Sequence, residues 1–431
     1  MREFNIGIVG FGTVGAGVVE CILKNGDLIG SRAGVWPVIR RVADLDITTD
    51  RGVTLPEGVL TTDVARVVDA PDIDVVIELI GGTALAKDFI LRALNNGKPV
   101  ITANKALLAK HGAEIFAAAK ASKADVFYEA SVAGGIPIIK AVREGLAGNR
   151  ILEICGILNG TCNYILTQME KHGADFATVL GQAQAAGYAE TPPDLDIDGL
   201  DTAHKATILA SLAYGEWFGM EPLFVEGIRG IALQDIDNAD ALGYRIKLLA
   251  IIKQDTGKVE MRVHPALVPK RAMLANVDGV FNAVCVRGDT VGDTMYYGRG
   301  AGREATASAV VADIIDVALN AKSGSPRRIP AFHPHEGYTS IVKMDDVQTR
   351  YYLRLQVEDH AGVLSAIADI LGGLNISIAS LSQKETGGTF VPLVILTHLA
   401  READMRAAMD KFAASDIVAG APVLLRVEDL D

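Results

Sequence analysis

The first twenty residues hold the sequence feature that most constrains the fold, an apolar run followed by a glycine-rich turn and a helical pattern. Asn5 to Val9 is typical of a buried parallel strand, and Val14 to Lys24 of the helix that follows it. Between them, "GFGTVG" has the G-x-G-x-x-G spacing, which permits a tight turn, a close approach of backbone to a diphosphate, and close helix packing. An ordinary glycine-containing turn is the alternative, but the flanking strand and helix favour phosphate binding. The predicted cofactor-binding residues are Gly10, Phe11, Gly12, Thr13, Val14 and Gly15.

The predicted second strand, Val38 to Ala43, bears on the type of cofactor. Asp44 follows this strand, where dinucleotide-binding folds place the acidic residue that holds ribose hydroxyls. Asp44 therefore favours NAD, whereas the neighbouring Arg40 and Arg41 favour the ribose phosphate of NADP. A solvated strand end with no role in binding is a third interpretation, and the sequence leaves the choice open.

Strands and helices continue to alternate, which predicts a doubly wound parallel sheet of Rossmann type. After it come an α+β domain with a mixed sheet, a linker rich in proline, and a βαββαβ unit of ferredoxin-like type. We predict an NAD(P)-binding domain over 1–130, a substrate-binding, catalytic and dimerisation domain over 131–304, a helix over 305–322 that returns to the first domain, a linker over 323–350, and a C-terminal regulatory domain over 351–431.

Composition excludes several classes of partner. The formal net charge of -12 argues against nucleic acid, whose phosphates need a positive face. No segment approaches the roughly 20 uninterrupted apolar residues of a membrane span. The chain starts almost directly with a core strand rather than a cleavable leader, so we expect a cytoplasmic protein. Cys21, Cys155, Cys162 and Cys285 lack C-x-x-C pairing and are interpreted as free thiols; His333 and His335 flank a proline and do not indicate a metal site.

An acidic stretch followed by a lysine is the strongest indication of chemistry. "GYAETPPDLDIDGLDTAHK" crowds five carboxylates into twelve residues, which raises electrostatic repulsion and therefore suggests function. Asp198 or Asp201 is a candidate helix cap. Lys205 lies four residues after Asp201, so helical spacing puts both on one face, and an apolar segment follows. A partly buried ammonium of this kind can protonate a carbonyl oxygen, although a surface ion pair is the alternative; His204 is a weaker candidate.

A second lysine lies at a strand end of the predicted nucleotide-binding domain. Lys105 in "TANKALL" follows a predicted strand, and ligands of such domains bind at the carboxyl ends of the strands. We predict that Lys105 holds a substrate anion or a cofactor phosphate. A plain surface lysine is the alternative.

Together these motifs resemble homoserine dehydrogenases of the monofunctional bacterial type with a C-terminal ACT domain. The matching segments include "GIVGFGTVG", "TANKALL", "YEASVAGGIPII", "GILNGTCNYIL", "GYAETPPDLDIDGLDTAHK" and "YYGRGAGREATAS", in consistent order. The resemblance implies reversible NAD(P)-dependent interconversion of L-homoserine and L-aspartate 4-semialdehyde, in the route to threonine, methionine and isoleucine. It also implies a homodimer or homotetramer.

Several residue roles follow from the resemblance alone. Lys205 would be the proton donor, and Asp201 and Lys105 would be the other catalytic residues. Lys105 would lie near nicotinamide and substrate, and Gly302 would close over the cofactor. The implied substrate-binding residues are Gly187, Glu190, Asp196, Asp201 and Lys205. A structural sodium ion would be bound by Glu129 and by the backbone carbonyls of Val132, Gly134 and Ile136.

"EDHAGVLSAIADILGGLNISI" resembles an ACT domain, for which threonine is the expected effector, bound between two paired domains. The implied effector residues are Asp359, His360, Ala361, Gly362, Asn375 and Ile376. Two other readings share the first and last domains: another ACT-tailed NAD(P) dehydrogenase acting on hydroxy acids, and a non-catalytic amino-acid sensor. The hydroxy-acid dehydrogenases lack the acidic stretch before the lysine. A sensor needs neither the lysine nor the crowded carboxylates.

Overall fold

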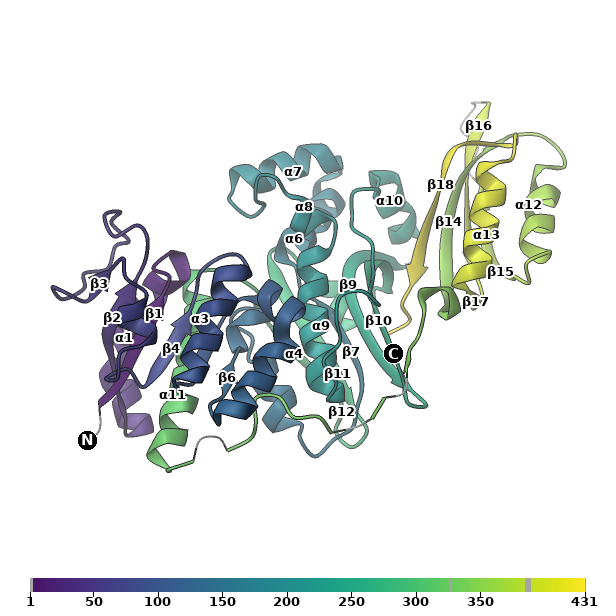
Figure 1. The fold of residues 1–431 in the computed structure, drawn as a ribbon. Helices are drawn as coiled ribbons and strands as arrows, with labels where there is room; N and C mark the ends of the chain where they lie inside the picture. The colour runs from purple at the N-terminus through teal and green to yellow at the C-terminus, as the bar shows by residue number, and fades with distance from the viewer. Residues whose placement is uncertain (1–2, 326–327, 336, 339, 384–388, 431) are drawn as a thin grey trace. The chain divides into compact units, whose positions relative to one another are not determined.

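The fold is that of a computed structural model, which describes residues 3–325, 328–335, 337–338, 340–383 and 389–430 (Figure 1). The chain forms two compact units, each built from three segments. Unit 1 comprises Met1–Gly160, Asp201–Leu223 and Phe281–Tyr338, and unit 2 comprises Thr161–Leu200, Phe224–Val280 and Thr339–Asp431. Each unit is described by itself.

A parallel sheet of six strands forms the first part of unit 1, in the order β3-β2-β1-β4-β5-β6. This is the doubly wound arrangement that the alternating sequence pattern predicts, with the switch in strand order between β1 and β4. The strands are β1 (Glu3–Val9), β2 (Trp36–Ala43), β3 (Leu60–Thr61), β4 (Val75–Glu78), β5 (Val100–Thr102) and β6 (Val126–Phe127). The helices that connect them are α1 (Thr13–Ala33), α2 (Ala65–Val68), α3 (Ala84–Asn95) and α4 (Lys105–Ser122).

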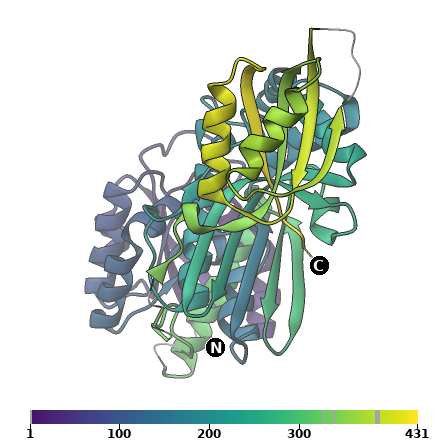
Figure 2. The ribbon, with the colours of Figure 1, turned by 90° about the vertical axis from the view of Figure 1, so that its right-hand side faces the viewer.

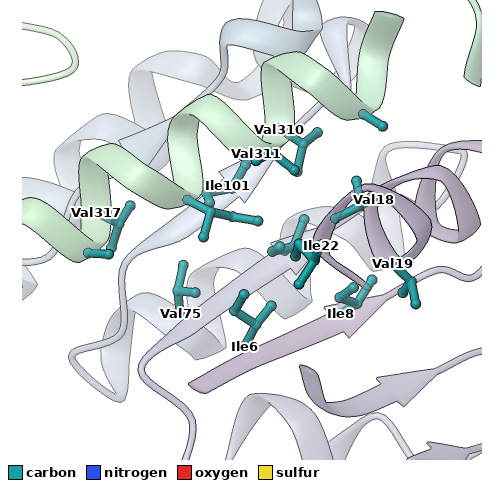
Figure 3. Packing of buried hydrophobic residues seen from close by; sticks show 14 of the residues in the cluster. Ile6, Ile8, Val18, Val19, Ile22, Val75, Ile101, Val310, Val311 and Val317 are labelled. Carbon is teal, nitrogen blue, oxygen red and sulfur yellow. The ribbon is translucent and has the colours of Figure 1, made fainter. Parts of the chain in front are cut away.

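Helix α11 (Arg303–Lys322) returns from far along the chain and packs beside α1 on one face of this sheet. Figure 3 shows valines of α11 and α1 meeting Ile6 and Ile8 of β1. On the opposite face, Gly7 leaves room for Val67 of α2. This helix covers the range 305–322 that the sequence predicts to return to the first domain, and each fully buried aliphatic side chain in this core contributes about 2 kcal/mol of burial free energy.

The rest of unit 1 includes three antiparallel strands and the helix that carries Lys205. Strand β11 lies between β7 and β12, with Cys155 opposite Cys285. Helix α9 is buried along nearly its whole length. The elements are β7 (Ile151–Ile157), β11 (Phe281–Gly288), β12 (Gly292–Arg299), a 3-10 turn η1 (Glu129–Ser131), α5 (Ile138–Lys140), a π-helical turn η2 (Ala141–Gly145) and α9 (Leu200–Tyr214).

Unit 2 contains a second sheet, in which the long antiparallel pair β9 (Tyr244–Asp255) and β10 (Lys258–Pro269) is joined to strands from the end of the chain. Both β8 (Phe224–Val225) and β18 (Val418–Val427) pair with β10 in parallel. The other elements before the C-terminal domain are α6 (Gly160–His172), α7 (Phe176–Ala185), α8 (Asp194–Ile197), α10 (Leu233–Ala241), η3 (Met273–Asn276), β13 (Ser340–Ile341) and η4 (Met344–Asp346).

The C-terminal domain has the predicted βαββαβ order, and Figure 2 shows its two helices side by side on one face of its strands. Its elements are β14 (Gln348–Glu358), α12 (Val363–Gly372), β15 (Ile378–Gln383), β16 (Phe390–Thr397), the short β17 (Ala400–Arg401), α13 (Glu402–Ala413) and β18. The sequence predicts this tail as a domain of its own, and its helices α12 and α13 share a hydrophobic core with its strands. Its last strand pairs with β10, Ala266 opposite Arg426, so the domain shares a sheet with the rest of unit 2.

Helix α1 runs to Ala33, well past the predicted end at Lys24, because Gly26 and Gly30 are accommodated within it and Trp36 packs against Gly30. The predicted linker 323–350 contains short elements and the first residues of β14, while 326–327, 336 and 339 lie outside the described residues. Across the ranges that the structure describes, no helix is long and apolar enough to cross a membrane.

Candidate active site

The glycine turn between β1 and α1 requires glycine at two positions for steric reasons. Gly10 has φ +105°, and a Cβ there would lie 2.6 Å from the carbonyl oxygen of Leu79. A Cβ on Gly15 would lie 2.1 Å from the carbonyl oxygen of Gly10. Gly12 is different, because no atom lies within 4 Å of its Cβ position. The turn is therefore closely packed behind Gly10 and Gly15 and open at Gly12, directly before α1, as a diphosphate at a helix N-terminus needs.

Asp44, which follows β2, is hydrogen-bonded to this turn. Its Oδ2 accepts a hydrogen bond of 2.5 Å from the backbone N–H of Phe11, and its Oδ1 accepts one of 2.8 Å from Asp46. The two arginines considered for a ribose phosphate are directed elsewhere. Arg40 bonds Glu3 and Asn5 at the start of β1, and Arg41 bonds Asp72 before β4. Both side chains are therefore bound by residues near the amino ends of β1 and β4.

A second helix begins beside the glycine turn. Gly302, the N-cap of α11, has φ +117° and open space at its Cβ position. The next residue, Arg303, packs on Gly17 of α1 and pairs with Glu20 at 2.9 Å. Two helix N-termini therefore lie close to each other in unit 1. Because each carries a partial positive charge and unpaired N–H groups, the pair is suited to an anionic ligand.

Two lysines share one buried carboxylate in unit 1. Lys205 Nζ lies 2.7 Å from Oδ2 of Asp201, and Lys105 Nζ lies 2.7 Å from its Oδ1. Lys205 also donates to the carbonyl oxygen of Leu158 at 2.6 Å, and the Asn159 amide donates to Asp201 Oδ2 at 2.9 Å. The structure thus brings together the three residues predicted to be catalytic, which belong to α4 and α9. We call Lys105, Asp201 and Lys205 the lysine centre.

Electrostatics keep Asp201 ionised. Burial by itself would raise its pKa, but the ammonium groups of Lys205 and Lys105 outweigh burial and hold the pKa below its usual value. The side chains of Lys205 and Asp201 are each 9% exposed, whereas that of Lys105 is 40% exposed, so the centre opens through Lys105. Asp201 is an ion-pair partner rather than the helix cap that we considered.

Lys105 is positioned by a small network at the carboxyl ends of β4 and β5. Asn104 caps α4 by accepting from the N–H of Leu107, and its amide donates to the carbonyl oxygen of Gly82 at 2.7 Å. Thr102 donates to the buried carboxylate of Glu78 at 2.6 Å. Burial raises the pKa of Glu78 to about 7, although hydrogen bonds from Thr102 and Ile80 lower it in part.

Two of these residues, Asn159 and Glu78, are absent from the sequence predictions. Asn159 is the second residue after β7, and Glu78 is the last residue of β4, so each stands at or near the end of an apolar strand. A polar residue at that position is the signal that identifies such residues. His204, on the same helix as Lys205, is half-buried, and burial lowers its pKa.

The acidic stretch without Asp201, residues 190–198, belongs to unit 2, and we keep the name acidic stretch for these residues. Glu190 is exposed and Asp196 is half-buried, while Gly187 ends the turn after α7 with φ +73°. Asp194 and Asp198 both pair with Arg229, which offsets part of the like-charge repulsion. The carbonyl oxygen of Asp196 accepts from the Cys162 thiol. This part of the predicted substrate site is therefore defined only within its own unit.

The predicted sodium loop follows β6. Both oxygens of the Glu129 carboxylate accept backbone N–H groups, from Ile139 at 2.9 Å and Lys140 at 2.8 Å. Burial raises the pKa of Glu129 to about 7. Ala133 and Gly134, with φ of 55° and 52°, bend the loop between the predicted carbonyl ligands. Within the described ranges, no cluster of three His, Cys, Asp or Glu side chains is suited to a metal; His335 instead contacts backbone carbonyls.

The six predicted effector residues fall into two groups in the C-terminal domain. Residues 359–362 lead into α12, where Gly362 has φ +97° as its N-cap, whereas Asn375 and Ile376 follow its carboxyl end. Ten helical residues span about 15 Å, so one domain does not bring the groups together. His360 is exposed, and hydrogen bonds to the Ala361 carbonyl and Glu358 raise its pKa.

A glycine turn at the switch point of a doubly wound sheet, together with a buried, ion-paired lysine in the same unit, is typical of a nicotinamide-nucleotide oxidoreductase. Comparison with known proteins identifies the family. Family models match over residues 10–129 (homoserine dehydrogenase, NAD binding domain), 137–315 (homoserine dehydrogenase) and 351–415 (ACT domain).

Full-length relatives and a solved structure agree. The chain is 45% identical to the homoserine dehydrogenases of Pseudomonas aeruginosa and of Neisseria gonorrhoeae, in both cases over 100% of each chain. The crystal structure of a homoserine dehydrogenase from Thiobacillus denitrificans superposes with a TM-score of 0.93 at 47% identity, covering 100% of this chain and 99% of that one. The chain belongs to the homoserine dehydrogenase family, which are NAD(P)-dependent oxidoreductases acting on a CH–OH group.

Proposed function

We propose that the lysine centre performs the proton transfer that accompanies interconversion of L-homoserine and L-aspartate 4-semialdehyde. The observation that carries this proposal is the sharing of the buried Asp201 carboxylate by Lys205 and Lys105. An ammonium held in a fixed position, with one carboxylate to orient it, suits a general acid. The activity test is absorbance at 340 nm with L-homoserine and either NAD or NADP.

Lys205 is the proposed acid. In the reducing direction its ammonium gives a proton to the carbonyl oxygen of the substrate, and in the oxidising direction the neutral amine removes the hydroxyl proton. Asp201 remains ionised throughout and aligns Nζ, because its pKa lies well below that of any ammonium. Lys105, the more exposed of the two, is proposed to hold an anionic group of the substrate or cofactor.

The cofactor is proposed to lie over the glycine turn of unit 1. When bound, the nicotinamide accepts or supplies the hydride. The open space at Gly12 and Gly302 and the N-termini of α1 and α11 fit its phosphates. Asp44, already hydrogen-bonded to the turn, is proposed to accept from the ribose hydroxyls, which supports NAD over NADP. The expected result of the 340 nm assay is a lower KM for NAD than for NADP; the reverse order would contradict the role of Asp44.

Three further assignments follow from the resemblance and are proposals. Gly187, Glu190 and Asp196 bind the amino-acid part of the substrate. A sodium ion stabilises the loop through backbone carbonyls of Val132, Gly134 and Ile136; because both oxygens of the Glu129 side chain hold the next helical turn, we propose that Glu129 contributes its own carbonyl. The domain division is that proposed from the sequence, with boundaries at 130, 304, 322 and 350.

Threonine is the proposed effector of the ACT domain. Since the two groups of effector residues lie at opposite ends of α12, we propose that a second copy of the domain completes the site in a homodimer or homotetramer. Support would be inhibition of the full-length enzyme by L-threonine, together with its loss in Asn375→Ala. An enzyme that is insensitive to L-threonine would remove this assignment but not the catalytic one.

A further inference from the structure

A short segment of unit 2, Phe224–Arg229, contacts the ACT domain at one end. Arg426 of β18 donates to Glu226 through Nη1 at 2.7 Å. The guanidinium of Arg426 also lies over the ring of Phe224, 4.8 Å from its centroid, and that of Arg406 lies 5.6 Å from the same ring. We call Phe224–Arg229 the bridging segment.

The ACT residue at this contact is rigidly held. Arg426 is 3% exposed and donates to both oxygens of Glu402, the first residue of α13. Glu402 is fully buried and also accepts from the hydroxyl of Tyr351 at 2.9 Å. Because such charge-assisted bonds are strong and directional, Arg426 moves with β18 and α13 rather than independently of them. The contact between Arg426 and Glu226 therefore changes whenever the core of the ACT domain moves.

At its other end, the bridging segment packs on the acidic stretch without space between the two backbones. A Cβ on Gly227 would lie 2.1 Å from the carbonyl oxygen of Ile197. The N–H of Ile228 donates to that same oxygen at 2.8 Å, and both isoleucines are fully buried. Arg229 then pairs with Asp194 and Asp198. The residue next to the ACT contact thus lies directly against the acidic stretch.

We propose that the bridging segment positions the acidic stretch for substrate binding and transmits the state of the ACT domain to it. Glu226 and Gly227 are positioning residues, since neither is assigned to the substrate. Glu226 contacts the buried Arg426 of the ACT domain, and the next residue, Gly227, contacts the backbone of Ile197. A displacement of β18 relative to β10 therefore shifts the acidic stretch. This inference rests on the proposed function, in which Glu190 and Asp196 bind the amino-acid substrate.

The principal test is Glu226→Gln in the full-length enzyme, which removes the charge without changing the shape. Its matched control is Tyr352→Phe, because Tyr352 also joins the ACT domain to the rest of unit 2, through a 3.0 Å bond to Asp235 of α10. KM for L-homoserine, kcat, inhibition by L-threonine and the melting temperature are measured for each. Gly227→Ala is a second variant, in which the added methyl group pushes on Ile197.

We expect Glu226→Gln to raise the KM for L-homoserine by about 3-fold or more and to weaken L-threonine inhibition by about 5-fold, with kcat and melting temperature changed little. Tyr352→Phe should leave KM and inhibition at the wild-type values, and Gly227→Ala should raise KM by about 10-fold. The inference is overturned if Glu226→Gln has wild-type KM and wild-type inhibition, or if Tyr352→Phe changes them equally.

Failure of the proposed function gives a different pattern. If Glu190→Gln leaves KM unchanged, the acidic stretch does not bind the substrate, whatever Glu226→Gln does. If the wild-type enzyme does not respond to L-threonine, the effector assignment fails. The KM values of the Glu226, Gly227 and Tyr352 variants then decide the inference alone.

Discussion

Two buried ionic clusters, one in each unit, use similar groups for different purposes. The lysine centre of unit 1 has two ammonium groups on one carboxylate. In unit 2, Arg262 of β10 pairs with Glu428 at 2.5 Å and with Glu260 at 2.7 Å, and Lys253 pairs with Glu428 at 2.9 Å. We call this second cluster the arginine centre.

The two clusters differ in the cation that is most deeply buried. In the arginine centre this cation is Arg262, whose side chain is 2% exposed, whereas its lysine, Lys253, is 34% exposed. A guanidinium does not release its proton at accessible pH. In the lysine centre the most deeply buried cation is Lys205, with a side chain that is 9% exposed, and an amine can lose its proton. The chemical type of the buried cation therefore distinguishes the candidate active site from the arginine centre.

The sharpest test of this comparison is Lys205→Ala. We expect kcat to fall by about 10²- to 10⁴-fold, with cofactor affinity near normal, because a general acid is lost. Stopped-flow absorbance at 340 nm and cofactor titration measure the two effects. Lys247→Met is the matched control, since Lys247 is also a buried lysine, which donates to Asn163 and to the carbonyl oxygen of Val277 in unit 2. A wild-type kcat in Lys205→Ala would remove Lys205 from the mechanism.

The corresponding change in the arginine centre is Glu428→Gln, which should act on stability. Removing one partner leaves the charge of Arg262 buried and only partly compensated, so the free energy of unfolding should fall by about 4 kcal/mol. Urea unfolding followed by circular dichroism measures it, and kcat per folded enzyme should be unchanged. Glu260→Gln, at a more exposed partner, should cost less. Equal costs for the two variants would contradict the importance of burial.

The network beneath Lys105 predicts a pH-dependent stability. The pKa of Glu78 in the folded protein is about 7, above its value of 4.5 when unfolded. Folding therefore favours the protonated form. This stabilisation is complete below pH 4.5 and is lost as the pH rises through 7, by at most about 3 kcal/mol.

Glu78→Gln removes this titration while keeping the shape. Urea unfolding at pH 5 and pH 8 should show a larger loss of stability in the wild type than in the variant. Glu3→Gln, at an exposed residue of β1, is the control and should follow the wild type. Equal pH dependence in wild type and Glu78→Gln would show that Glu78 does not titrate in this range.

The smallest expected effect concerns Asn159, which orients Asp201 without bearing charge. Asn159→Ala should lower kcat/KM by about 10-fold, because one hydrogen bond to a charged group is lost. Steady-state assays measure it. Asn163→Ala, at a buried asparagine of α6 outside the lysine centre, should lower stability and leave kcat/KM of the folded enzyme unchanged. An unchanged kcat/KM in Asn159→Ala would mean that the two lysines fix Asp201 by themselves.

Much of the fold could be predicted from local patterns. The glycine turn, the alternation of strands and helices, the return helix α11 and the βαββαβ order of the ACT domain depend on periodicity and turn residues close together in the chain. The Asp201–Lys205 pair could be predicted for the same reason, since its spacing of four residues is about one helical turn. The pairing of Lys105 with Asp201 could not be predicted, because those residues are far apart in the sequence.

The amino-acid sequence by itself determined which segments form strands and helices, where glycine is sterically required, and which lysine follows an acidic residue on one helical face. Only the tertiary structure decided that Asp201 serves two lysines, that Asn159 and Glu78 support them, that Arg40 and Arg41 are directed away from the cofactor turn, and that β18 joins the ACT domain to β10. The physical reason is that these contacts join residues distant in the chain. Their partners are selected by packing and desolvation of the whole fold, which local periodicity does not encode.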